Sequence, residues 1–204
     1  MPAFPEGVCA AMFPFYFDPE EYMTDAGAPI SQKPEPLKVM RIFRGQDAPS
    51  LDEAGHMAYV DKDPVILDGA AKLGEAGIGE GAVLKCLFSG FGFSLHYVWF
   101  KPAYPLPLHS HDSDCLYYLI SGTIKMGTEE MAAGDGFFLP ADTPYTYTVG
   151  DEGVEILEFR TQEDFDIQFK GKTEAYWEKM LEKLRTEQPK WKEAMPPVRE
   201  YRNV

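Results

Sequence analysis

The chain of 204 residues is 45% hydrophobic and 25% charged, as is usual for a globular protein of one domain with extensions. Its formal net charge of −14 opposes contact with nucleic-acid phosphates and anionic membranes, and the sequence has no basic stripe to offset it. Every apolar run is shorter than the roughly 18 residues that a membrane span needs. We therefore expect neither nucleic acid nor a membrane as a partner.

The three cysteines are Cys9, Cys86 and Cys115, an odd number at wide spacings without a CxxC pair. This pattern argues against a disulfide framework and against a structural zinc knuckle. The N-terminal stretch MPAFPEGVCAAMFPF lacks the basic region that opens a signal peptide. We expect a reduced, cytoplasmic protein.

Residues 1–55 form the first predicted region, a proline-rich arm. Prolines at such spacing interrupt helices and central strands, so we expect irregular chain with one short strand at residues 37–43. The aromatic stretch MFPFYF favours an arm that docks on the body or on a partner subunit rather than a disordered tail.

Residues 56–165 form the second predicted region, a β-barrel. Short apolar or alternating runs recur there, separated by Gly, Pro, Asp or Thr, which is typical of a β-sandwich or barrel. We expect no amphipathic helix of 10–15 residues between them, and hence an all-β fold. The runs are MAYV, PVILD, AVLKCLF, FSLHYVWF, CLYYLI, TIKMG, DGFFLP, YTYTV and VEILEFR.

Residues 166–204 form the third predicted region, a C-terminal helix and tail. Apolar side chains recur at helical spacing over residues 173–187, with charges on the opposite face. Thr173 is a suitable N-cap, and Pro189 lies beyond the predicted end. The apolar face consists of Ala175, Trp177, Met180, Leu181 and Leu184.

The stretch HSHDSDCLYY carries the residues with the most specific chemistry. Residues two apart in a strand point to the same face, so His109 and His111 project together, and Cys115 and Tyr117 share that face if the strand continues. Two imidazoles in an apolar interior are costly unless they are hydrogen-bonded or bound to a metal. Imidazole suits iron, zinc, nickel, copper or manganese.

A catalytic metal usually needs a third protein ligand beside the histidine pair. His96, in FSLHYVWF, could supply another imidazole from a neighbouring strand, but both faces of that run are apolar and its direction stays open. The alternative is a polar loop that leads into an ordinary strand. The candidates for the third ligand are Cys115, Asp114, Tyr145, Tyr117 and His96.

This stretch resembles the first motif of the cupin superfamily, which runs glycine, five residues, HxH, three or four residues, glutamate, six residues, glycine. His109, His111 and Gly122 match the motif. The departures are Cys115 in place of the glutamate, and Pro102 or Ala103 in place of the opening glycine.

The second cupin motif runs glycine, five residues, proline, one residue, glycine, two residues, histidine. Gly134 and Pro140 match it, whereas Asp142 replaces the glycine and Tyr145 replaces the histidine. The cysteine at the glutamate position is similar to that of the thiol dioxygenases, a cupin branch with three histidines on iron. In cysteine dioxygenases this cysteine can be crosslinked to a tyrosine.

The resemblance implies an all-β fold, a double-stranded β-helix barrel of cupin type, here with an N-terminal arm and a C-terminal amphipathic helix. It also implies a central metal and a homodimer. We expect a divalent metal, with Fe(II) favoured over Zn, Mn or Ni, held by His109, His111 and a third ligand from Cys115 or His96.

The expected function is an iron-dependent dioxygenase acting on a small organic molecule in the barrel. Tyr117 and Tyr145 would orient the substrate or donate a proton. The alternatives are a lyase or isomerase in which the metal is a Lewis acid, a binding module without turnover, and a structural dimer that binds neither metal nor ligand.

Overall fold

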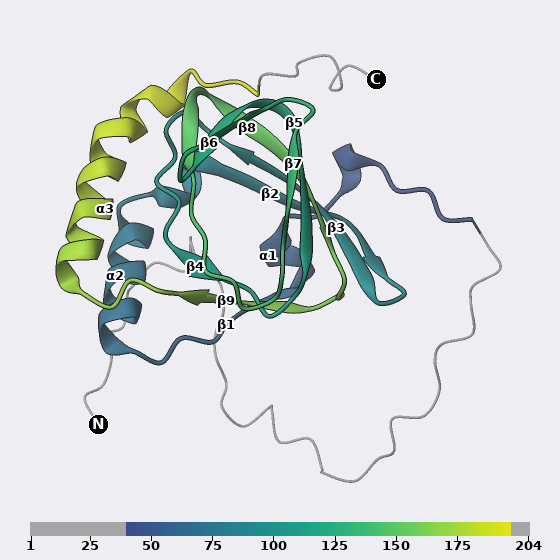
Figure 1. Ribbon diagram of the computed structural model, residues 1–204, viewed down its shortest axis with the longest axis horizontal. Helices are drawn as coiled ribbons and strands as arrows, with labels where there is room; N and C mark the ends of the chain where they lie inside the picture. Colours follow the sequence, from purple (N-terminus) through teal and green to yellow (C-terminus); the bar gives the residue numbers. More distant parts are fainter. Residues whose placement is uncertain (1–39, 197–204) are drawn as a thin grey trace, which may run out of the picture.

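The computed structural model describes residues 40–196, which form a β-sandwich with two long helices along one side (Figure 1). A six-stranded sheet has the order β2-β3-β8-β5-β6, with β7 also paired to β5, and a three-stranded sheet has the order β1-β9-β4. The strands are β1 (Met57–Tyr59), β2 (Ala82–Gly90), β3 (Phe93–Phe100), β4 (His109–Ser110), β5 (Cys115–Met126), β6 (Glu129–Ala132), β7 (Gly136–Leu139), β8 (Thr148–Arg160) and β9 (Phe165–Phe169).

The predicted C-terminal helix is confirmed as α3 (Glu174–Glu187). Thr173 caps it, because its side chain accepts a hydrogen bond from the backbone N–H of Tyr176. None of the helices within residues 40–196 has the length and apolar character to cross a membrane. The other helical segments are α1 (Leu51–Ala54), α2 (Pro64–Glu75) and the 3₁₀ turns Gly45–Asp47, Ile78–Gly81 and Gln188–Lys192.

The expectation of an all-β body was wrong at α2, which lies between β1 and β2. The run PVILD begins this helix: Asp63 caps it by accepting a hydrogen bond from the backbone N–H of Val65, and Pro64 occupies its first turn. Its buried positions are Ile66, Gly69 and Leu73. The four consecutive apolar residues hid this helical spacing, because a short apolar run fits a buried strand equally well.

Helices α2 and α3 pack against each other (Figure 1). Gly69 lies directly under the indole of Trp177, and a Cβ at Gly69 would come within 2.1 Å of that ring. Trp177 also belongs to the main hydrophobic core and lines a cavity between the helices and the sheets. The two helices therefore form one wall of the space enclosed by the sheets.

The predicted N-terminal arm lies largely outside the described residues. Of the predicted strand at 37–43, residues 40–43 are described and are not in a strand. At the other end of the body, β9 continues past residue 165, where the predicted β region ended.

At two positions where the cupin-like motifs lack their glycine, the backbone still has a glycine-type conformation. Ala103 has φ +53° and Asp142 has φ +60°, both in the left-handed region that favours glycine. Gly122, which matches the first motif, has φ +76°, and a Cβ there would lie 2.0 Å from the carbonyl oxygen of Gly153. The chain therefore keeps the glycine-type backbone where the glycine itself is absent.

Candidate functional site

A cavity of about 450 Å³ lies within the described part of the chain. Both sheets and both long helices line it: Leu84 comes from β2, Phe169 from β9 and Trp177 from α3. Aromatic and apolar side chains predominate, which suits a small organic molecule with an apolar body. The polar side chains of its wall include His109, His111, Tyr145, Glu158 and Arg160.

Backbone pairing places Tyr145 beside the histidine pair. His109 lies opposite Phe169 in the antiparallel pairing of β4 with β9. On its other side, the N–H of Tyr145 donates to the carbonyl of His109 at 2.8 Å, and the N–H of His109 donates to the carbonyl of Tyr145 at 3.1 Å. The tyrosine at the final-histidine position of the second motif is thus held against the first motif.

The two imidazoles are oriented by backbone carbonyls. His109 Nδ1 lies 2.7 Å from the carbonyl oxygen of Pro107, and His111 Nδ1 lies 2.5 Å from that of Asp166. A carbonyl can only accept, so each Nδ1 carries the proton and each Nε2 keeps its lone pair. The ring centroids of His109 and His111 are 4.9 Å apart.

Burial keeps both imidazoles neutral. It lowers the pKa of His109 to about 4 and that of His111 to about 2, with the positive charge of Arg160 acting in the same direction. Both side chains are therefore neutral near pH 7, which is the state that binds a metal ion.

Tyr117 and Tyr145 form a hydrogen-bonded pair with 2.7 Å between their hydroxyl oxygens. Tyr145 Oη also lies 3.4 Å from His111 Nε2. Because Nε2 carries a lone pair, Tyr145 donates to it and Tyr117 donates to Tyr145. Burial raises the pKa of both phenols, so both hold their protons in the absence of a metal.

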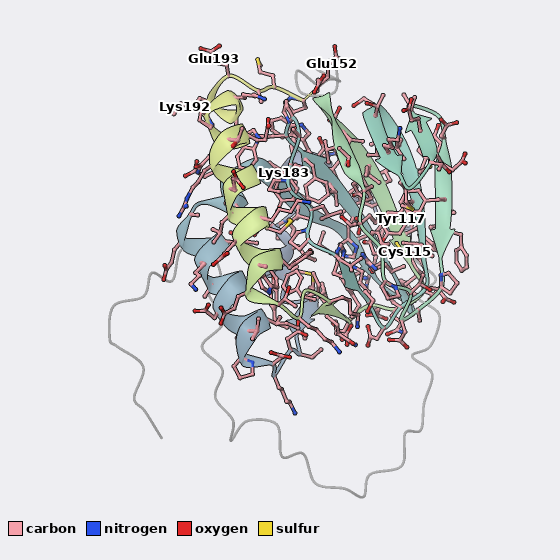
Figure 2. All side chains as sticks on the ribbon, turned by 60° about the vertical axis from the view of Figure 1, so that its left-hand side comes forward. Cys115, Tyr117, Glu152, Lys183, Lys192 and Glu193 are labelled. Atoms are coloured by element: carbon pink, nitrogen blue, oxygen red, sulfur yellow. The ribbon has the colours of Figure 1, made fainter. Side chains whose placement is uncertain are left out.

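Cys115 is the first residue of β5 and lies opposite Arg160 on β8 and Leu139 on β7. Its side chain is buried on the same face of β5 as that of Tyr117, and Figure 2 shows the two residues close together among the strands. Burial raises the pKa of the Cys115 thiol to about 12, so it is protonated near pH 7. Cys115 is not one of the described residues that line the cavity.

His96, whose direction the sequence left open, points into the interior and is 1% exposed. Its ring packs edge-on against Phe165 at 5.3 Å. Burial lowers its pKa to about 3, and Arg160 contributes to the shift. Neither ring nitrogen finds a hydrogen-bond partner among residues 40–196. Like Cys115, His96 is not among the described residues of the cavity wall.

Glu158 and Arg160 are cavity residues that the sequence analysis missed. Arg160 Nη2 donates to Glu158 Oε2 at 2.6 Å, Nη1 donates to Ser113 Oγ at 3.3 Å, and the guanidinium lies 4.1 Å over the ring of Phe165. Burial opposes the charge of Arg160, but Glu158 together with Tyr117, Cys115 and Tyr145 outweighs this effect, so the pKa of Arg160 is raised. The available signal was strand parity, because both charged residues share a face with Ile156 in the run VEILEFR.

Among residues 40–196, no three histidine, cysteine, aspartate or glutamate side chains lie in an arrangement that could hold a metal ion. Of the predicted site residues, the structure does bring His109, His111, Tyr145 and Tyr117 into one chain of contacts.

No family model matches the sequence, and no curated protein matches it. Solved structures do resemble it. An RmlC-like cupin from Shewanella frigidimarina is 20% identical over 41% of this chain and 78% of its own, with a TM-score of 0.37. The polyketide cyclase RemF from Streptomyces resistomycificus is 15% identical over 72% of this chain and 99% of its own, with a TM-score of 0.48.

An oxalate decarboxylase from Bacillus subtilis is 17% identical over 41% of this chain and 25% of its own, with a TM-score of 0.36. The chain thus resembles these three solved structures at low sequence identity.

Proposed function

We propose that this protein is a cupin-type dioxygenase that uses Fe(II) to oxidise a small, mainly apolar organic molecule in the cavity. The observation that supports this best is the orientation of His109 and His111. Their Nδ1 atoms are tied to backbone carbonyls, which fixes both rings and leaves both Nε2 lone pairs for a metal.

Tyr145 is the proposed third ligand. Its hydroxyl oxygen lies 3.4 Å from His111 Nε2. Two ligand atoms with metal bonds of about 2.0–2.1 Å at a tetrahedral angle are separated by roughly 3.3 Å, so this spacing suits a pair of ligands on one ion. Metal binding would displace the phenol proton, as it does for other protic ligands. Two imidazoles and one anionic oxygen correspond in charge and donor type to the two-histidine, one-carboxylate set of non-haem iron oxygenases.

The chain itself would then do three things. Tyr117 donates a hydrogen bond to Tyr145 Oη and stabilises its anionic form. The aromatic walls exclude water from the bound molecule. Glu158 and Arg160 offer the polar contact that orients it. When bound, Fe(II) would supply open positions for substrate and O₂.

Cys115 has no part in this proposal, although the resemblance to thiol dioxygenases had suggested one. The cavity wall has Tyr145 rather than Cys115 beside the histidines, and the cysteine is a buried thiol. His96 has no part in it either, because its side chain is buried and is not among the described residues that line the cavity.

A second candidate is a non-redox enzyme, a lyase or isomerase. The direct hydrogen bond between Tyr117 and Tyr145 favours it, since two linked phenols can pass a proton to and from a bound molecule. In that case Tyr145 remains a protonated acid and the metal acts only as a Lewis acid.

The test is anaerobic loading of the purified chain with Fe(II), followed by metal analysis and by exposure to nitric oxide as a substitute for O₂. We expect near-stoichiometric iron and a high-spin iron–nitrosyl signal in electron paramagnetic resonance. The His109→Ala/His111→Ala variant should lose both. His56→Ala is the matched control, because His56 pairs with Asp164 at 2.7 Å and does not line the cavity.

Iron binding without a nitrosyl signal would support the lyase or isomerase instead. Failure of the folded wild type to retain Fe(II), Mn(II), Zn(II) or Ni(II) would overturn the metal-dependent proposals and leave a binding module. Circular dichroism shows whether each variant is folded, since both histidines are buried.

A further inference from the structure

Two oppositely charged side chains of β8, Glu158 and Arg160, differ in what they offer to a molecule in the cavity. Glu158 points inward, because it lies opposite the buried residues Tyr117 on β5 and His96 on β3. The carboxylate side chain is 11% exposed, whereas the guanidinium side chain is only 2% exposed. Since both residues line the cavity, the carboxylate is the group that a ligand can reach more easily.

The guanidinium of Arg160 is largely engaged by the protein itself. Nη2 donates to Glu158 Oε2 at 2.6 Å, and Nη1 donates to Ser113 Oγ at 3.3 Å. Nε is buried and has no hydrogen-bond partner among residues 40–196, and the ring of Phe165 covers the guanidinium at 4.1 Å. An anionic ligand therefore finds no open edge of this group on which to form paired hydrogen bonds.

Glu158 keeps one acceptor atom for a ligand. Its Oε2 accepts from Arg160, whereas its Oε1 accepts no hydrogen bond from the described part of the chain. The residue is 8% exposed, yet Oε1 is not among the fully enclosed polar atoms of the described residues. A buried acceptor without a donor costs free energy, which a donor on the ligand would recover. A ligand carboxylate at the same place would be repelled.

The neighbouring guanidinium decides which charge the donor carries. Because Arg160 already neutralises Glu158, a ligand ammonium would bring a further charge out of water into a mainly apolar cavity. A hydroxyl group costs much less to desolvate, and its hydrogen bond to a carboxylate is a strong one. The other acidic and basic residues of the described wall, Asp52 and Lys85, are not buried.

We propose that the molecule bound in the cavity is neutral, has an apolar body and carries a hydroxyl group that donates a hydrogen bond to Glu158 Oε1. This inference rests on the proposed function, since the same cavity holds the substrate, and it narrows the substrate class to hydroxylated molecules. Arg160 is a positioning residue, because it holds the carboxylate through Oε2. The selection needs no metal, as neither residue is a proposed metal ligand.

The experiment is isothermal titration calorimetry of the metal-free full chain with three probes that share one ring system. The probes are 2-naphthol, its methyl ether and 2-naphthoate. We expect 2-naphthol to bind at least about 10-fold more tightly than either of the others. The ether lacks the donor for Glu158 Oε1, and the carboxylate meets the negative charge of Glu158.

Glu158→Gln exchanges the acceptor for a donor at nearly the same shape. The amide oxygen should stay with Arg160, because a cation attracts oxygen, and the amide N–H group should face the ligand. The preference for 2-naphthol over its methyl ether should then fall to about 3-fold or less. Both proteins receive the same probes, so the change in this ratio isolates the contact.

Glu163→Gln is the matched control and should keep the preference. Glu163 accepts a hydrogen bond from the N–H of Gly92 at 2.8 Å and is not among the described residues that line the cavity. Circular dichroism shows whether each variant folds. If Glu158→Gln does not fold, the probe series on the wild type decides alone.

A wild type that binds the ether or 2-naphthoate as tightly as 2-naphthol would overturn the inference, as would failure to bind 2-naphthol at about 1 mM. A preference that persists in folded Glu158→Gln would assign the selection to another residue and refute it too. Iron loading separates this result from the dioxygenase proposal. A chain that retains iron without selecting the hydroxyl refutes only this inference, and a chain that selects the hydroxyl without retaining a metal refutes only the metal-dependent reaction.

Discussion

The carboxylate of Glu158 and the guanidinium of Arg160 form a 2.6 Å ion pair inside the protein, two residues apart on one strand. Both groups would be costly to bury alone. Each is therefore tolerated because of the other, and the pair sits in the cavity wall, where a bound molecule can reach it.

Replacing one member of this pair should cost more stability, relative to the number of groups removed, than replacing both. We expect Arg160→Met and Glu158→Leu each to lower the free energy of unfolding by about 3–5 kcal/mol, because one buried charge is left without its partner. The double variant should lose clearly less than the sum of the two. Urea unfolding of the four proteins gives the coupling energy, and purely additive losses would contradict the role assigned to the pair.

Gly122 should not tolerate a side chain. In Gly122→Ala the new Cβ would meet the carbonyl oxygen of Gly153 at 2.0 Å while the backbone keeps φ +76°. We expect a loss of about 3 kcal/mol or more in the free energy of unfolding. The control is Gly127→Ala, where φ is +60° but nothing lies within 4 Å, and where about 1 kcal/mol should be lost. Equal losses would mean that the contact with Gly153 relaxes freely.

Acid should destabilise the metal-free chain through His96. Burial lowers its pKa to about 3 in the folded chain, while the unfolded value is the ordinary 6.5. The unfolded state therefore takes up a proton first as the pH falls. The stability that the neutral His96 contributes is complete above pH 6.5 and declines by about 1.4 kcal/mol per pH unit below it. In His96→Leu this loss should vanish, so unfolding curves at pH 7 and pH 5 should differ less than in the wild type. The same difference in both proteins would refute this origin of the acid sensitivity.

The proposed ligand role of Tyr145 predicts a difference between the two phenols. Tyr145→Phe should weaken Co(II) binding at least roughly 10-fold and abolish the visible phenolate band of the Fe(III)-loaded protein. Tyr117→Phe should keep the band and weaken binding less, because Tyr117 touches the metal position only through Tyr145 Oη. Titration followed by absorption measures both effects. A band that survives in Tyr145→Phe would assign the ligand elsewhere.

Local patterns predicted the parts of the fold that depend on local chemistry. The cap at Thr173 and the period of α3 are both local, and the helix is where the sequence placed it. The shared face of Cys115 and Tyr117 follows from strand alternation alone, and the structure shows that this face is the buried one. Helix α2 was missed because the run PVILD opens with four consecutive apolar residues, which do not show a helical period.

The candidate site depends on pairings that the sequence does not reveal. Tyr145 meets His109 through a bridge between distant segments, and its place beside His111 follows from that register. His96 could point either way, since both faces of its strand are apolar. Glu158 and Arg160 were overlooked because charged residues in a strand are usually exposed, and their mutual neutralisation appears only in three dimensions.

Ligand binding in the cavity is also coupled to folding of the chain. Its wall takes side chains from both sheets and from both long helices, so a molecule that fills it is bound only by the folded chain. Such a ligand stabilises the fold by mass action, by about 2.7 kcal/mol at 100 times its dissociation constant. A rise in melting temperature can therefore identify the natural ligand from a collection of metabolites before any reaction is known.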